Sequence, residues 1–406
     1  MEERITYPYK KEEEIKHPSR VSIRQSNIEL LRILCMIMIV AHHFSVHTKL
    51  AYDPSSISFN RLYYEFLYTW GKIGVNIFVI ITGYFSFRNV TLKMGKVFQF
   101  YLQTFFYSVA IFAIFAIFNL PVGDSGNFVF TWSGFFQNLF PITHDRWWFA
   151  SAYFVLIILS PFINLFISNI NRSGLKLVLL ILGIFYVVIP TFFIYDNFFT
   201  AHWGTNQIVW FVFMYLLGAY YGKYGFRFDI KASRLFLLAL AIMAVTFITV
   251  IIFDKVGMKD PWYLFENKNK YYYEMQSIPI LIASVCIFQA FLKIDIGSNK
   301  IINAISSVTF GIYLIHDNLL LRELWWKNII RDTVLTKWLN FPNVESIQHF
   351  IPLSIAIILF VFIVGGIIEA IRLYLIEPLY IKGFLKLGKK IDDNVDEYIK
   401  KEGFNS

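Results

Sequence analysis

Long apolar segments alternate with short polar ones along most of this 406-residue chain. A helix needs about 20 mostly apolar residues to cross roughly 30 Å of hydrocarbon. Ten segments reach or approach that length, and the sixth and eighth of them are the shortest. The predicted membrane spans are 27–47, 70–87, 97–119, 147–167, 175–195, 207–221, 235–253, 278–291, 301–321 and 351–376. The pattern therefore predicts an all-α, polytopic membrane protein with about ten transmembrane helices.

Composition agrees with a membrane protein and suggests how the chain is divided. Only 16% of the residues are charged and 57% are hydrophobic, whereas soluble domains average about 25% charged residues. Lys and Arg concentrate in the segments that share a side with both termini, which is typical of cytoplasmic segments. We therefore expect both termini in the cytoplasm, and we do not interpret the net charge of +9 as nucleic-acid binding. The predicted parts are a polar cytoplasmic tail (1–25), a transmembrane domain (26–380) and a basic cytoplasmic C-terminal tail (381–406).

The first predicted span carries titratable side chains that a membrane helix normally lacks. Glu29, Arg32, His42, His43 and His47 all lie within it, and such residues inside a bilayer mark a functional site by default. Arg32 and His43 are eleven residues apart, so on a helix they share one face and lie about 16 Å apart along the axis. Glu29 precedes Arg32 by three residues, which is close enough for an ion pair.

Plainer interpretations of these residues remain open at this point. Glu29, Arg32 and His47 lie near the ends of the span, so their side chains could extend to the membrane surface and keep their charged or polar groups in water. The spacing of His42, His43 and His47 is compatible with metal ligands, but no second ligand cluster accompanies it in the sequence. We therefore expect no metal. His43 lies deepest, and we take it as the candidate catalytic residue, because histidine can act as a base or carry an acyl group.

Motifs in three later spans extend the pattern. Residues 74–84 read GVNIFVIITGY, residues 147–149 read WWF, and residues 307–316 read SVTFGIYLIH. Together with Glu29, Arg32 and His43, and in this order, they resemble the acyltransferase 3 family over about residues 22–380. This is a family of integral membrane O-acyltransferases, many of which acetylate cell-surface polysaccharides. Two positions depart from the family pattern: Asn76 replaces the usual Asp of the second span, and Lys93 and Lys96 stand near the place of a common Arg-x-x-Arg pair.

The resemblance implies a function and a set of roles. The donor would be acetyl-CoA, and the acceptor a hydroxyl of a cell-surface polysaccharide or of its lipid-linked precursor at the plasma membrane. Arg32 and Glu29 would form the donor end, with Lys93 and Lys96 as further contacts of the donor. His316, Tyr313, Trp147 and Asn76 would line a cavity shared with the catalytic His43. Trp147 and its neighbour also fit an aromatic belt at the membrane surface. A glycan-assembly complex is a further partner that this function allows.

A transporter or exporter of a polysaccharide or solute is the alternative function. Ten spans with intramembrane titratable residues are compatible with it. A pair of matching Gly- or Pro-interrupted spans would point to an inverted-repeat transporter. The sequence shows no such pair. The order of the motifs favours the acyltransferase.

Overall fold

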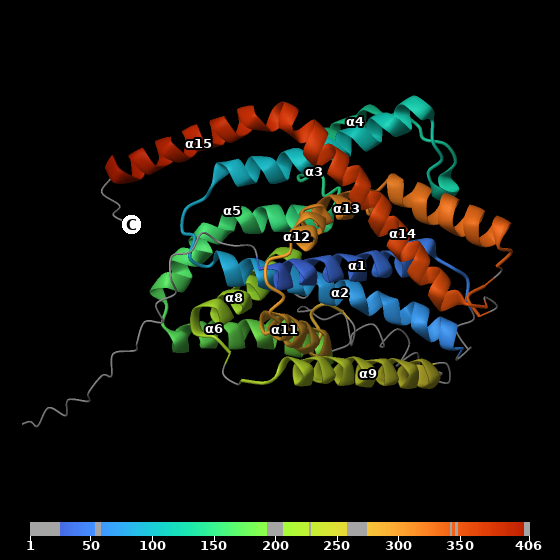
Figure 1. Ribbon diagram of the computed structural model, residues 1–406, viewed down its shortest axis with the longest axis horizontal. Helices are drawn as coiled ribbons and strands as arrows, with labels where there is room; N and C mark the ends of the chain where they lie inside the picture. Colours follow the sequence, from blue (N-terminus) through green and yellow to red (C-terminus); the bar gives the residue numbers. More distant parts are fainter. Residues whose placement is uncertain are drawn as a thin grey trace, which may run out of the picture.

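The structure is a computed structural model that describes residues 25–52, 58–192, 206–226, 229–257, 274–341, 343–345 and 348–401. Within these ranges the regular structure is helical, apart from one isolated bridge between Pro121 and Asn127. The predicted tail 1–25 lies almost entirely outside the described residues. The all-α prediction is confirmed for the part of the chain that the structure describes (Figure 1).

The long helices are α1 (Ser26–Thr48), α2 (Phe59–Ser86), α3 (Met94–Phe118), α5 (Trp148–Asn169), α6 (Arg172–Gly183), α8 (Gln207–Tyr224), α9 (Ala232–Gly257), α11 (Ile278–Leu292), α14 (Phe350–Ile371) and α15 (Glu377–Lys401). The shorter ones are η1 (Gly123–Ser125), α4 (Trp132–Leu139), η2 (Ile184–Val188), α7 (Ile189–Phe192), α12 (Lys300–Ser307), α13 (Thr309–His316), η4 (Glu323–Trp338) and η5 (Arg372–Ile376). The segments η2, η4 and η5 are π-helical.

Seven helical segments of the described chain are long and apolar enough to cross a membrane: Ser26–Thr48, Phe59–Ser86, Met94–Phe118, Trp148–Asn169, Arg172–Phe192, Ala232–Thr249 and Phe350–Val395. The remaining three predicted spans are helical but fall short of that standard. The span at 278–291 is the 15-residue α11, and the span at 301–321 is divided at Val308 into α12 and α13. The span at 207–221 is α8, which is not among the seven. The structure therefore supports a multi-pass membrane protein, with seven spans identified by length and composition.

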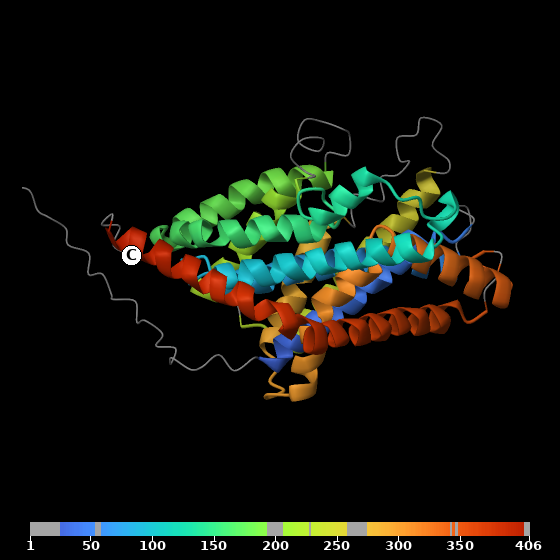
Figure 2. The ribbon, with the colours of Figure 1, turned by 90° about the horizontal axis from the view of Figure 1, so that it is seen from above.

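From α1 to α14 the long helices run in alternating directions, with α12 and α13 together forming one pass, so the bundle has two ends that carry different residues (Figures 1 and 2). At one end, Ser26 at the start of α1 hydrogen-bonds Asn303 of α12, and Asn27 donates to the carbonyl of Phe291 at the end of α11. We call this the Ser26 end, and the opposite one, where α1 finishes, the Thr48 end. At the Ser26 end the helix α15 continues α14 and lies along α3, where Asp392 accepts a hydrogen bond from the Met94 amide. The segment predicted as a C-terminal tail is thus helical up to Lys401.

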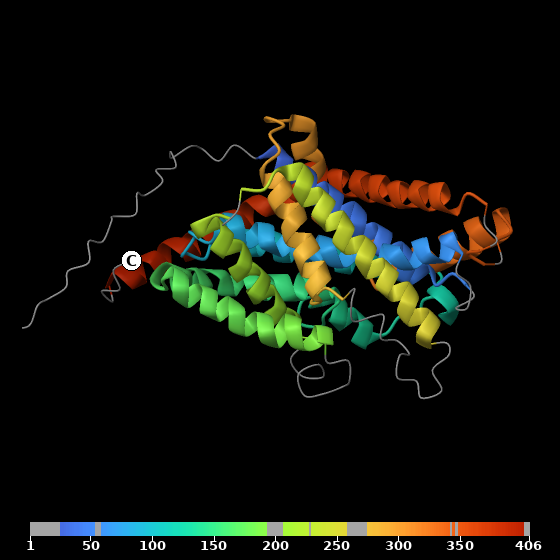
Figure 3. The ribbon, with the colours of Figure 1, turned by 90° about the horizontal axis from the view of Figure 1, so that it is seen from below.

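Glycines allow α2 to pack closely on two neighbours. On one side, Gly74 of α2 lies against the backbone of α1, where an added Cβ would stand 2.8 Å from the Cys35 carbonyl oxygen. On the other side, Gly83 of α2 faces the carbonyl of Tyr215, and Gly218 of α8 faces the carbonyl of Ile80. Small residues permit this close approach of membrane helices. The contacts place α2 between α1 and α8, with α11 and α9 packed outside them (Figure 3).

Replacing Gly218 with alanine should therefore destabilise the protein by about 1–3 kcal/mol, the usual cost of overpacking a close contact. The new methyl group would meet backbone of α2, which cannot rotate away as a flexible side chain could. Gly183→Ala is the matched control, because an added Cβ there meets nothing within 4 Å. Denaturation of the two purified variants in detergent measures the difference, and equal stability would contradict this account of the α2–α8 contact.

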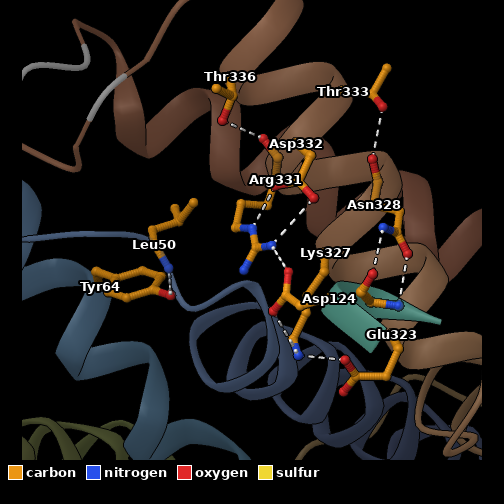
Figure 4. Close-up of polar contacts among 11 residues, drawn as sticks. Leu50, Tyr64, Asp124, Glu323, Lys327, Asn328, Arg331, Asp332, Thr333 and Thr336 are labelled. Carbon is orange, nitrogen blue, oxygen red and sulfur yellow. Dashed lines mark hydrogen bonds and ion pairs between the residues drawn. The ribbon is translucent and has the colours of Figure 1, made fainter. Parts of the chain in front are cut away.

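At the Thr48 end, a polar cluster ties the loop after α3 to η4 (Figure 4). Arg331 of η4 donates to Asp124 of η1 at 2.9 Å, and Lys327 lies 3.7 Å from the same carboxylate. The amide of Gly123 donates to the side chain of Asn328 at 3.0 Å. The hydrogen bond and charge of Arg331 hold the pKa of the Asp124 carboxyl below its usual range. The cluster fixes η4, which follows closely on α13 and its histidine, His316.

Candidate active site

A cavity of about 530 Å³ lies among α1, α2, α5 and the α12–α13 pair. Glu29 and Arg32 line it towards the Ser26 end, while His42, His43 and Lys72 line it towards the Thr48 end. Because Arg32 and His43 are eleven residues apart on one helix, the cavity extends along about 16 Å of α1. The face of α1 that the sequence singled out is therefore the face that lines the cavity.

The Ser26 end of the cavity contains a supported ion pair. Arg32 donates to Glu29 Oε1 at 2.7 Å, and Ser306 of α12 donates to Glu29 Oε2 at 2.5 Å. Glu29 is buried, whereas the Arg32 side chain is one-third exposed at 33%. Both carboxylate oxygens of Glu29 thus have partners. An arginine has five N–H donors, so Arg32 retains donors that can bind an anion entering the cavity.

Towards the Thr48 end, His43 in the cavity wall forms a hydrogen-bonded pair with a histidine of another helix that lies behind the wall. The Nδ1 of His43 lies 2.8 Å from the Nε2 of His316, and both rings are buried. The Nδ1 of His316 lies 2.6 Å from the carbonyl oxygen of Ile312. A carbonyl oxygen only accepts, so the His316 Nδ1 carries the hydrogen, and in the neutral ring its Nε2 is the acceptor. His43 must then donate from Nδ1, which leaves its lone pair on Nε2.

An acidic group stands beside this lone pair. Asp317 Oδ1 is 3.8 Å from His43 Nε2 and 3.1 Å from His47 Nε2, so only His47 is within hydrogen-bonding distance. Asp317 is buried directly after α13, and Trp326 of η4 donates to the His316 carbonyl at 3.1 Å beside it. At 3.8 Å the carboxylate can stabilise the charge that His43 acquires when it takes a proton.

The same groups are close enough to share a metal ion. His43, His47 and Asp317 each offer one ligand atom, and these atoms lie within 4.8 Å of one another. In the present arrangement the contacts among these residues are the hydrogen bond from His47 to Asp317 and the longer contact of His43 with the same oxygen.

Tyr313 adds a polar group to the cavity wall. Its side chain is only 4% exposed, its ring packs edge-on against Phe149 at 5.5 Å, and its ring centroid is 6.5 Å from that of His43. The Tyr313 hydroxyl has no hydrogen-bond partner among the described residues. A buried hydroxyl without a partner is costly, so Tyr313 is poised to donate to a molecule bound beside His43.

The structure places five other sequence candidates outside the cavity wall. His316 is one of them, because it hydrogen-bonds His43 from behind and does not itself line the cavity. Trp147 is 2% exposed in the core just before α5, and its neighbour Trp148 lines the cavity instead. Asn76 is fully buried, donates to the Met275 carbonyl at 2.8 Å and accepts from an indole N–H at 2.9 Å, so it holds helices together. Lys93 and Lys96 are exposed at the start of α3 and do not reach the cavity.

Other residues of the site were given no role from the sequence, although His42 was noted among the titratable residues of the first span. Lys72 and His42 line the cavity, and Asp317 stands behind His43. Lys72 had a usable signal, because it is a charged residue inside the predicted span 70–87, close to its start, and charged residues within spans mark functional sites. His42 had a weaker one, since it adjoins His43 but lies about 100° away around the helix.

Comparison with protein families agrees with this geometry. The model of the acyltransferase domain that defines the acyltransferase 3 family matches residues 25–370, which include all the cavity residues named above. No curated protein and no solved structure matches the chain. Because the family match covers most of the sequence, this multi-pass membrane protein belongs to the acyltransferase 3 family.

Proposed function

We propose that the protein is an O-acyltransferase of the plasma membrane that moves an acetyl group from acetyl-CoA to a hydroxyl of a cell-surface polysaccharide or its lipid-linked precursor. The observation that carries the proposal is the single cavity that joins the Arg32 guanidinium to the His43 imidazole. It provides a cation for a phosphorylated donor at one end and a base at the other.

The shape of the cavity favours coenzyme A over a compact acyl donor. About 16 Å of helix separate Arg32 from His43, so a donor whose phosphates bind Arg32 needs a long, thin arm to bring its acyl group to the histidine. The phosphopantetheine arm of coenzyme A is such a group. The exposed Lys93 and Lys96 lie at the start of α3 and can attract the remaining phosphates by charge. In this proposal the Ser26 end faces the cytoplasm, which is also the orientation expected from the distribution of Lys and Arg.

The chemistry follows from the tautomer assignment. His43 Nε2 removes the proton of the acceptor hydroxyl, whose oxygen attacks the thioester carbonyl. The Tyr313 hydroxyl donates to the developing oxyanion, while Asp317 stabilises the imidazolium and His316 orients the ring. The C–S bond then breaks, and the leaving thiolate takes the proton back from His43. The same lone pair could instead carry the acyl group, and the two routes differ in whether an acetyl-enzyme forms before the acceptor binds.

Substitution of Asp317 by asparagine tests the electrostatic part of this scheme. The amide keeps the size of the side chain and can still accept a hydrogen bond from His47, but it removes the charge beside His43. We expect kcat to fall by about 100-fold or more, which is typical for the loss of a preorganised electrostatic contact, while KM for acetyl-CoA changes little. A change confined to KM would contradict the assigned role.

The enzyme and the transporter are distinguished by following the acetyl group. Membrane vesicles that contain the protein are incubated with acetyl-CoA labelled in its acetyl group, and the surface glycan is then recovered. We expect label in the glycan that alkali releases as acetate. Accumulation of a solute in the vesicles without acetyl-CoA, together with an unlabelled glycan, would favour the transporter instead.

A further inference from the structure

We propose that the Thr48 end of the cavity is a subsite for an uncharged sugar ring of the acyl acceptor, formed by His42, Lys72, Trp148 and Gln207. The proposal rests on the function proposed above, because it assigns the second substrate of that reaction. It also predicts that the acceptor approaches His43 from the end opposite to the donor.

Among the described residues, the charge at this end of the cavity is balanced. Lys72 Nζ lies 3.1 Å from Glu274 Oε2 and 4.9 Å from the centre of the Tyr68 ring. The Tyr68 hydroxyl donates to the other oxygen of Glu274 at 3.0 Å. Because Glu274 neutralises the charge of Lys72, little uncompensated positive charge remains to attract an anionic acceptor. The site instead offers polar groups without a net charge, which suits the hydroxyls of a neutral sugar.

The same network fixes the tautomer of His42. The Nδ1 of His42 lies 2.7 Å from the carbonyl oxygen of Tyr68, so this nitrogen donates and the lone pair of the neutral ring is on Nε2. Gly71 packs tightly against the ring, because a Cβ there would lie 2.6 Å from the ring atom Cγ of His42. His42 is therefore a positioned acceptor for a hydroxyl, and its ring centroid lies 5.3 Å from that of the candidate base, His43.

The walls of this end fit a ring with one apolar face. Trp148 lines the cavity with a partly exposed indole, packed against Phe149 and Phe211. Gln207, the first residue of α8, is exposed and brings an amide to the cavity. An aromatic surface with a few convergent polar groups is the usual construction of a small-molecule site. The Ser26 end differs, because its Arg32 is a partly exposed cation with donors to spare.

Steady-state kinetics with both substrates test the proposal. The full-length protein is reconstituted in liposomes and given labelled acetyl-CoA and the surface glycan of its host after alkaline deacetylation. We expect Trp148→Ala and Gln207→Ala each to raise KM for the glycan at least 10-fold, with KM for acetyl-CoA within 2-fold of the wild type. Trp132→Ala is the matched control, because Trp132 is 69% exposed on α4 and does not line the cavity. An unchanged KM for the glycan in both cavity variants would overturn the subsite.

A second variant tests whether the subsite takes an uncharged ring. Glu274→Gln keeps a hydrogen-bond acceptor for Tyr68 but releases the charge of Lys72. For a neutral sugar, KM for the glycan should stay the same or rise. A fall in this KM would overturn the assignment, because it would reveal an anionic acceptor attracted to the freed lysine. If the wild type transfers no label at all, the proposed function fails; if it transfers label while these variants behave otherwise than expected, the subsite alone fails.

Discussion

Replacing His43 with alanine should lower the rate of acetyl transfer by about 10²–10⁴-fold, the range that a general base contributes. The reason lies in the orientation of the ring. The hydrogen bond from Nδ1 to His316 leaves Nε2 as the only basic nitrogen of His43, and a change to alanine removes it. A histidine that carries the acyl group would give a loss at least as large.

The control for this substitution is His144→Ala, because His144 is an exposed loop residue outside the cavity wall. Both variants should reach the membrane in wild-type amounts and elute as single species in detergent. Full activity of His43→Ala under these conditions would show that the histidine pair is structural, and the scheme proposed here would then have no base.

The second large effect is expected on stability, at Arg372. This residue is only 2% exposed and donates to both oxygens of Glu369, at 2.8 and 2.7 Å. It also forms an ion pair with Glu377 at 2.7 Å. Arg372→Met should destabilise the protein by about 3–5 kcal/mol, because it leaves buried carboxylates without their counter-charge. Denaturation of the purified protein in detergent measures the loss.

Two comparisons make this prediction specific. Arg88→Met removes an exposed arginine at the same end of the bundle and should cost little. Adding Glu369→Gln and Glu377→Gln to Arg372→Met should recover part of the stability, since the stranded charges are then removed. Equal stability of the Arg372 and Arg88 variants would contradict the account.

The Arg372 network also supports the candidate active site, because Glu369 packs directly against Gly311 of α13, the helix that carries Tyr313 and His316.

Features set by local spacing were accessible from the sequence. The i, i+3 spacing of Glu29 and Arg32 predicts their ion pair, and the eleven-residue spacing of Arg32 and His43 predicts their common face. The expectation that His43 and His316 share a polar cavity rests on two intramembrane histidines on separate helices. The structure brings their rings together, but only His43 lines the cavity. The helical fold was equally predictable, because apolar length alone implies membrane helices.

Features that depend on contacts between distant helices were not accessible. The sequence gives no reason for Trp148 rather than Trp147 to face the cavity, because the rotation of α5 is set by its packing against other helices. Asn76 looks like a site residue in sequence, yet its two hydrogen bonds are to Trp210 and Met275. The predicted spans 207–221 and 278–291 were the shortest ones, and the helices found there, α8 and α11, do not reach the length and hydropathy of the seven spanning segments.

Alkali-releasable acetate on purified surface glycans is the measurement that tests the central claim most directly. A deletion strain is complemented with the wild-type gene, with His43→Ala or with His144→Ala, and membrane levels of the three proteins are matched. The account predicts that the wild type and His144→Ala restore the acetate, whereas His43→Ala leaves it at the level of the deletion. Acetate that the deletion does not change, or that His43→Ala restores in full, would contradict the account.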